Sequence, residues 1–178
     1  MKLLKVAFRS VFMAILLLNT PVDARFIDSD YPKTVRAILD KKESNDDLTH
    51  PPKTFDVLKH TPSGQPFKEQ WVYHQRSDYQ SIEISYLIGS THYSESYSLL
   101  NRALIYASES EYTEYSPDSI RGLQISYFVK GGKLIHLSST GHGKTEDDAW
   151  EPEQELMTRY KKRIQELQRL IRAHKNSN

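Results

Sequence analysis

Two segments of the chain alternate between apolar and polar residues, which is the pattern of a β-strand with one buried face. Within residues 80–89 the apolar positions are Ile82, Ile84, Tyr86 and Ile88. Within residues 121–130 they are Leu123, Ile125, Tyr127 and Val129. Each segment lies beside a second apolar run. We therefore expect two antiparallel hairpins, at about residues 70–89 and 121–139.

The second hairpin is expected to turn at a pair of glycines. Gly131 and Gly132 separate two apolar runs, and glycine reaches the positive φ angles that two-residue hairpin turns require. A turn at this pair also sets the register of the two strands. The predicted partners are Lys130 with Lys133, Val129 with Leu134, Phe128 with Ile135, and Tyr127 with His136.

Residues 152–174 have the periodicity of a long helix. Pro152 suits the first helical position, and the acidic residues beside it complement the positive end of the helix dipole. Apolar residues recur every three or four positions and form one stripe. This stripe comprises Leu156, Met157, Tyr160, Ile164, Leu167, Leu170 and Ile171. We expect the helix to pack on the sheet of its own domain.

Two other uses of this helix stay open. A helix from a partner would also cover the stripe and would give a weak dimer. The basic residues on the rest of the helix, from Arg159 to Lys175, would instead suit an anionic membrane surface. The two alternatives differ in what they need: the first uses the apolar stripe and the second uses the basic positions.

Residues 96–109 fit both a helix and a strand. Apolar residues recur there at a spacing of three and four, and the segment contains the helix formers Leu, Arg, Ala and Glu. The run Leu104–Tyr106 would also suit a strand. We favour a helix over 96–109, followed by an acidic loop over 109–118.

The stretch before the first hairpin, residues 25–69, is rich in proline and turn-forming residues. A short helix would suit the residues after Pro32, because apolar residues follow at helical spacing. The clusters at Pro51-Pro52 and at 61–64 are typical of turns or linkers. We expect an irregular N-terminal arm over 25–69 and a single α+β domain over 70–178.

The first 24 residues have the three parts of an export signal. These parts are the basic residues Lys2, Lys5 and Arg9, the apolar run Val11–Leu18, and small or aliphatic residues at Val22 and Ala24. The apolar run is far shorter than the roughly 20 residues that cross a bilayer. We expect a cleaved signal peptide over 1–24 and no stable membrane span afterwards. An uncleaved signal anchor or a buried helix is the alternative.

The charge balance and the absence of cysteine exclude several classes of protein. The chain has 24 Lys+Arg, 23 Asp+Glu and no Cys, with a formal charge of +1. The predicted signal peptide carries three basic residues and one acidic residue, so its removal lowers that charge by two. A near-neutral domain has no basic field for nucleic acid. Without cysteine there is no disulfide, no thiolate metal site, no Cys nucleophile and no Cys-linked lipid.

The same absences bear on the destination of the exported chain. Asn45, Asn101 and Asn176 each lack the Ser or Thr that N-glycosylation requires two residues later. Secreted eukaryotic domains often carry disulfides or such sites. We therefore expect the bacterial periplasm or secretion from the cell.

One loop contains the best candidates for chemistry. Residues 138–145, SSTGHGKT, end like a phosphate-binding loop, but Ser138 stands where the first glycine is required. We expect no nucleotide and no other cofactor. His136, His142 and Asp147 lie in or near this loop, but their spacing matches no metal-ligand set. A small hydrolase or metal-dependent enzyme centred on these three residues is the alternative function, and we assign no catalytic or metal-binding residue.

Tyrosine is concentrated in the middle of the chain, where nine of the 11 tyrosines lie between Tyr73 and Tyr127. Tyrosine favours strands, and it also favours recognition surfaces because it joins a large contact area to a polar tip. The candidate binding residues are Tyr112, Tyr115, Tyr127, His136 and His142. We expect an exported, non-catalytic protein that binds another envelope protein or a cell-wall component.

Overall fold

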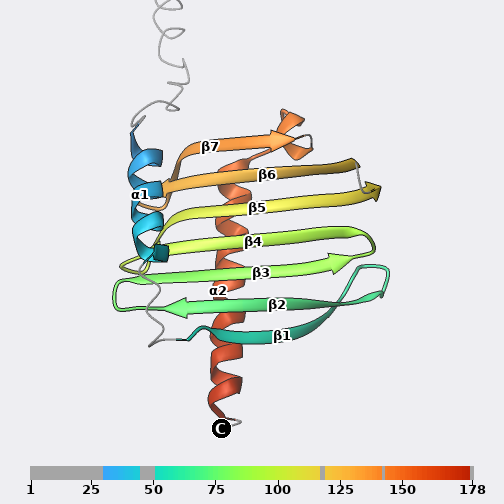
Figure 1. Cartoon of the computed structure of the whole chain (residues 1–178), viewed down its shortest axis with the longest axis horizontal. Helices are drawn as coiled ribbons and strands as arrows, with labels where there is room; N and C mark the ends of the chain where they lie inside the picture. Colours follow the sequence, from blue (N-terminus) through green and yellow to red (C-terminus); the bar gives the residue numbers. More distant parts are fainter. Residues whose placement is uncertain (1–29, 45–50, 117–118, 142, 177–178) are drawn as a thin grey trace, which may run out of the picture.

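A computed structural model describes residues 30–44, 51–116, 119–141 and 143–176 of the chain. These residues form a seven-stranded antiparallel sheet in which each strand pairs with the next along the chain (Figure 1). The strands are β1 (Lys53–His60), β2 (Pro66–Gln75), β3 (Tyr79–Ile88), β4 (Thr91–Leu100), β5 (Ala103–Ser116), β6 (Ser119–Lys130) and β7 (Lys133–Gly141). The helices are α1 (Tyr31–Ser44), the short 3₁₀ helix η2 (Lys144–Glu146) and α2 (Pro152–Asn176). The predicted signal peptide, residues 1–24, lies outside the described residues.

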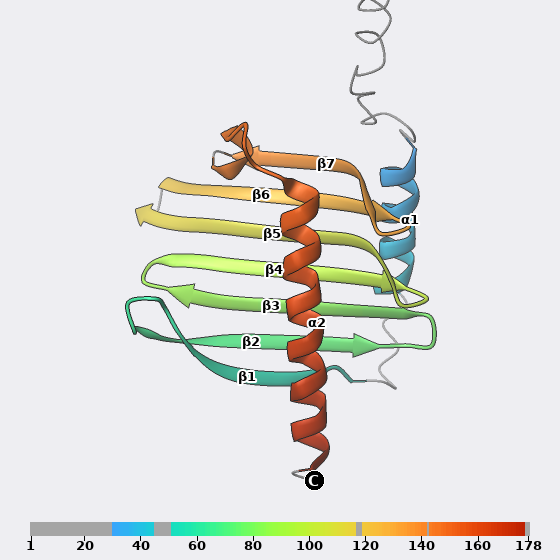
Figure 2. The same cartoon turned by 180° about the vertical axis from the view of Figure 1, so that it is seen from behind.

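The two long helices pack on opposite faces of the sheet. Helix α2 crosses the strands near their middle, from β7 to β1, and α1 lies on the other face near one end of the strands (Figure 2). The predicted α+β class and the long C-terminal helix are confirmed. None of the described helices combines the length and the apolar character needed to cross a membrane.

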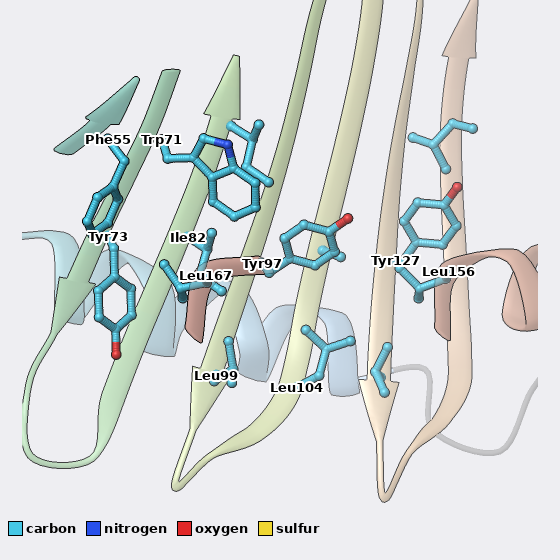
Figure 3. Packing of buried hydrophobic residues seen from close by; sticks show 14 residues of the cluster. Phe55, Trp71, Tyr73, Ile82, Tyr97, Leu99, Leu104, Tyr127, Leu156 and Leu167 are labelled. Carbon is cyan, nitrogen blue, oxygen red and sulfur yellow. The ribbon is translucent and has the colours of Figure 1, made fainter. Parts of the chain in front are cut away.

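The main core lies between α2 and the sheet. In Figure 3, large side chains from β1, β2, β3, β4 and β6 meet Leu156 and Leu167 of α2. Each fully buried side chain of this size stabilises the fold by about 1.5–3 kcal/mol. The apolar stripe of α2 therefore packs on the sheet of its own chain, as predicted.

A second core joins α1 to the other face. Val35 and Leu39 of α1 are buried against Tyr79, Ile105 and Phe128. The short helix expected after Pro32 is present as α1, but the predicted arm over 25–69 also contains all of β1 and the first residues of β2, which we did not expect. The cluster at 61–64 is a hairpin turn between strands, in which the Gly64 N–H donates to the Thr61 carbonyl at 2.9 Å.

The prediction of a helix over residues 96–109 is wrong. These residues form the end of β4, a turn and the start of β5. Asn101 and Arg102 have φ angles of 50° and 66°, so they make a tight hairpin turn with no glycine. The left-handed conformation is tolerated by Asn but is unusual for Arg. The sequence therefore lacks the usual hairpin signal.

The glycine-pair hairpin forms at the predicted place. Lys130 pairs with Lys133 and Val129 pairs with Leu134, and both turn glycines have positive φ. The next two predicted pairs are wrong, because a β-bulge places His136 opposite Phe128 and Leu137 opposite Tyr127. An extra residue on one strand reverses the faces of the residues beyond it. The bulge lets Leu134 and Leu137 both contact the main core, while His136 is exposed.

Candidate functional site

A buried network of ion pairs lies between α2 and the sheet. The Arg163 guanidinium donates to both oxygens of Glu95, at 2.5 and 3.1 Å, and to Glu69 at 3.1 Å. It also reaches Glu166 on its own helix at 3.3 Å. Glu95 accepts a further hydrogen bond from the Tyr97 hydroxyl at 2.6 Å. Both strand carboxylates are buried, so their charges depend on this arginine.

A second part of the network lies nearer to β7. Arg159 donates to Glu109 and, at 3.2 Å, to Glu155 on its own helix. Glu109 also accepts a hydrogen bond from the Tyr127 hydroxyl and pairs with Lys144 at 2.7 Å. Lys144 donates to Glu155 at 2.5 Å. The network therefore joins β5, β6, η2 and α2.

The sheet register explains why cations are needed here. Glu95 on β4 is directly opposite Glu109 on β5, and both side chains lie on the α2 face. Like charges directly opposite one another on a sheet are destabilising. Arg159 and Arg163 lie one turn apart on α2, so both reach the pair. The helix thus supplies the positive charge that the paired carboxylates require.

This environment changes the pKa values of the network residues. Burial alone would raise the pKa of Glu95, but hydrogen bonds and charge from Arg163 outweigh it and hold this pKa below the ordinary 4.5. Burial raises the pKa of the Tyr86 hydroxyl to about 12, with a further contribution from Glu95. Burial also raises the pKa of Tyr127, as does its hydrogen bond to Glu109. Glu95 is therefore ionised at neutral pH, and the two tyrosines are neutral.

We expect the stability of the protein to depend on the charge of Glu95. A pKa that is depressed on folding contributes stability that is complete above the unfolded value and is lost as the pH falls through the folded value. The free energy of unfolding should therefore fall as the pH drops below about 4.5. Urea unfolding at several pH values would measure this. Glu95→Gln should flatten the dependence, whereas the exposed control Glu83→Gln should not. Identical profiles for the two variants would contradict the assignment.

A cleft opens beside this network on the α2 face of the sheet. Its volume is about 310 Å³. The side chains that line it include Tyr86, Tyr93, Glu95, Glu109, Glu111, Leu123, Lys144 and Arg159. In Figure 3 the hydroxyls of Tyr97 and Tyr127 and the indole nitrogen of Trp71 are directed toward one end of the strands. The cleft thus combines aromatic, acidic and basic groups within a small volume.

An aromatic row extends from the cleft across three strands. Tyr86 and Tyr93 are stacked, with centroids 5.0 Å apart and planes at 12°. Phe67 contacts the other side of Tyr86, at 5.3 Å between centroids. All three rings are only partly buried. We call these three rings the tyrosine shelf. The shelf lies beside an ionic wall made by Glu95, Glu109 and Arg159.

The loop after β7 completes the wall of the cleft. Gly141 has a φ of +90°, and a Cβ at this position would lie 1.9 Å from the Gly122 carbonyl oxygen. Only glycine fits where β7 ends. The chain then turns so that Lys144 lies between Glu109 and Glu155, with its ammonium 5.4 Å from the centre of the Trp150 ring.

The residues predicted to bind lie at separate places. Tyr127 is fully buried within the network, with its hydroxyl on Glu109. Tyr112 and His136 are exposed on the α1 face, where Tyr112 stacks on His92 at 4.6 Å and His136 contacts Phe128 at 5.6 Å. Tyr115 lies in β5, and its side chain is not described. His142 lies outside the described residues. The described members of this set do not form one site.

The alternative catalytic centre is also spread out. His136 is on the α1 face of β7, whereas Asp147 lines a hollow beside α2 and caps the Ala149 N–H at 2.9 Å. Among the residues that the structure describes, no group of three or more His, Asp or Glu side chains is placed to hold a metal ion.

Sequence reasoning missed the residues that build the cleft. Glu95 lies in the alternating run Tyr93–Tyr97, at a position that faces the core. The same alternation within β5 places Glu109 on this face. An acidic residue at an inward strand position is a usable signal for a buried ion pair. The expectation of a helix over 96–109 concealed that signal.

The α1 face is less suited to a ligand. Its hydroxyls already pair with one another across strands, as in Ser94 with Ser110 and Ser96 with Ser108, both at 2.7 Å. In the cleft, by contrast, the Arg159 Nε–H is buried without a hydrogen-bond acceptor among the described residues. Buried donors are normally paired with protein or water. This donor lies 3.9 Å from a Glu95 oxygen, so its charge is compensated by an ion pair although its N–H is not hydrogen-bonded.

No protein-family model, curated protein or solved structure matches this chain. The functional argument therefore depends on the residues and their geometry.

Proposed function

We propose that this is an exported, non-catalytic protein that binds a cell-wall component, specifically a glycan chain, in the cleft beside α2. The observation that carries the proposal is the stacked, partly exposed pair Tyr86 and Tyr93 next to ionised acidic and basic groups. Sugar rings present C–H faces that lie flat on aromatic rings, and their hydroxyls need both donors and acceptors. A few placed polar groups beside aromatic walls are typical of ligand sites.

The cleft supplies both kinds of polar group. Glu111 is exposed at its edge, and its carboxylate accepts hydrogen bonds from hydroxyl donors. Arg159 and Lys144 contribute donors from the opposite wall. The wall is held in place by the ion pairs beneath it, so a ligand meets a preformed surface. Preformed sites lose less entropy when they bind.

The state of the two central carboxylates supports binding over acid–base catalysis. Glycosidases need one carboxyl group that stays protonated near neutral pH. Here the pKa of Glu95 is held low by Arg163, and Glu109 is paired with Arg159 and Lys144. The ion pairs of both groups suit a structural and recognition role.

The proposal predicts that Tyr93→Ala weakens glycan binding by about tenfold or more, since losing one stacked ring costs roughly 1.4 kcal/mol. Calorimetric titration with an N-acetylglucosamine tetrasaccharide and co-sedimentation with isolated bacterial sacculi would measure the effect. Tyr112→Ala is the matched control, because Tyr112 is an exposed, stacked tyrosine on the opposite face.

Two results would overturn this proposal. One is a wild-type protein that binds neither the tetrasaccharide nor sacculi. The other is a Tyr112→Ala variant that loses as much affinity as Tyr93→Ala.

The exported state has its own test. The full chain expressed in a bacterium should yield a periplasmic or secreted product that begins near Arg25.

A further inference from the structure

The two edges of the sheet differ in chemistry. Strand β1 carries Lys53, Asp56, Lys59 and His60, and charged edge residues hinder pairing with another chain. Strand β7 follows Lys133 with the sequence LIHLSSTG, which contains no Asp, Glu, Lys, Arg or Pro. Among the described residues, β7 pairs only with β6. Apart from the bulge near its start, its outer edge thus offers a template for a further strand.

A carboxylate already mimics such a strand at one point. The Leu134 N–H donates to the Glu153 side chain at 2.8 Å. Because Val129 and Leu134 are the pair next to the turn, this N–H points away from β6. Glu153 therefore accepts a hydrogen bond from the Leu134 N–H on the outer edge. The carbonyl of an added strand would accept from the same N–H.

The surroundings of this edge are acidic. Five carboxylates are exposed in the connection from β7 and the first turn of α2, namely Glu146, Asp147, Asp148, Glu151 and Glu153. A hollow of about 360 Å³ lies at the start of α2, lined by Glu151, Glu153 and Met157 among others. Side chains that project from an added strand toward α2 would meet negative charge and a partly apolar hollow.

We propose that β7 is a docking edge for an extended, basic segment of a partner protein, which adds as an eighth strand. Main-chain hydrogen bonds would supply affinity, and alternating Lys or Arg side chains would face Glu151 and Glu153. A second copy of this chain fits less well. Antiparallel pairing of two β7 strands would bring both acidic α2 starts to the same face near the twofold axis, and like charges there oppose association.

This edge is separate from the glycan cleft, so the two proposals fail independently. The test uses the full mature chain and a synthetic peptide in which lysine alternates with valine. Amide hydrogen exchange is followed by NMR or mass spectrometry. The peptide should slow exchange in β7 and leave β1 unchanged. A peptide that alternates glutamate with valine is the matched control and should have no effect.

The charge requirement is tested by Glu151→Gln combined with Glu153→Gln. Glutamine keeps the oxygen that accepts from Leu134, so the edge itself is preserved. The lysine peptide should bind this variant about tenfold more weakly, as expected for the loss of about 1.4 kcal/mol. Three outcomes would overturn the proposal. The lysine peptide could fail to slow amide exchange in β7, or both peptides could slow it equally. Alternatively, exchange in β7 could be slowed without peptide, by dimerisation at high protein concentration.

Discussion

Replacement of Arg163 with alanine is expected to destabilise the protein by about 3–5 kcal/mol. Arg163 is 9% exposed and holds the carboxylates of Glu69 and Glu95, which are 4% and 8% exposed. Removing one partner of a buried ion pair leaves the other charge desolvated without compensation. The loss of stability should thus be severalfold larger than that caused by replacing an ordinary surface arginine.

Urea unfolding followed by circular dichroism measures this loss. Arg169→Ala is the matched control, because Arg169 is exposed on the same helix and its loss should cost less than about 0.5 kcal/mol. Arg163→Lys keeps the charge but loses the two-pronged contact with Glu95, so its stability should be intermediate. Equal stabilities for Arg163→Ala and Arg169→Ala would show that the network contributes nothing to the fold.

Replacement of Trp71 with alanine is expected to cost about 3–5 kcal/mol as well. Trp71 is 1% exposed in the main core, and its indole N–H donates to Glu69 at 3.2 Å. The Arg163 guanidinium lies 5.4 Å from the centre of its ring. The substitution therefore removes core volume and one support of the ionic network together.

Trp71→Phe separates these two contributions. Phenylalanine fills much of the volume but donates no hydrogen bond, so this variant should lose about 1–3 kcal/mol. Because Trp71 and Arg163 share Glu69, the losses in a Trp71→Ala and Arg163→Ala double variant should not add. Additive losses, measured by thermal or urea unfolding, would contradict the coupling.

Alternation and glycine placement were enough to predict a sheet with two of its hairpins and the covering helix. They did not reveal β1 or the turn between β4 and β5. Asn101 and Arg102 adopt positive φ without glycine, so the backbone there follows the pairing of the strands on either side. Local sequence carries little information about such turns. The bulge at Phe128 likewise follows from core contacts of Leu134 and Leu137, which are long-range.

The candidate site was much harder to predict. Tyr127 was predicted as a binding residue, but its side chain is fully buried and its hydroxyl donates to Glu109. Tyr86 and Tyr93 meet only because β3 pairs with β4, and the second half of β4, residues 96–100, was predicted to be helical. A single sequence does not show which polar residues on separate strands become neighbours.

If the cleft binds a glycan as proposed, the network links stability with recognition. The arginines that anchor α2 also position the carboxylates beside the tyrosine shelf. The cleft therefore exists only while α2 is packed on the sheet. A variant that weakens the network should thus lose affinity as well as stability. Tyr93 lies outside the main core, so its replacement should lower affinity with little loss of stability, whereas Tyr86 also packs against the core.

NMR titration of the isotopically labelled chain with an N-acetylglucosamine tetrasaccharide tests the central claim most directly. The account predicts that shift changes are concentrated in β3, β4 and β5 around Tyr86, Tyr93 and Glu111, and that they disappear in Tyr93→Ala. Shift changes confined to the α1 face around Ser96, Ser108 and Tyr112, or no change at saturating sugar, would contradict it.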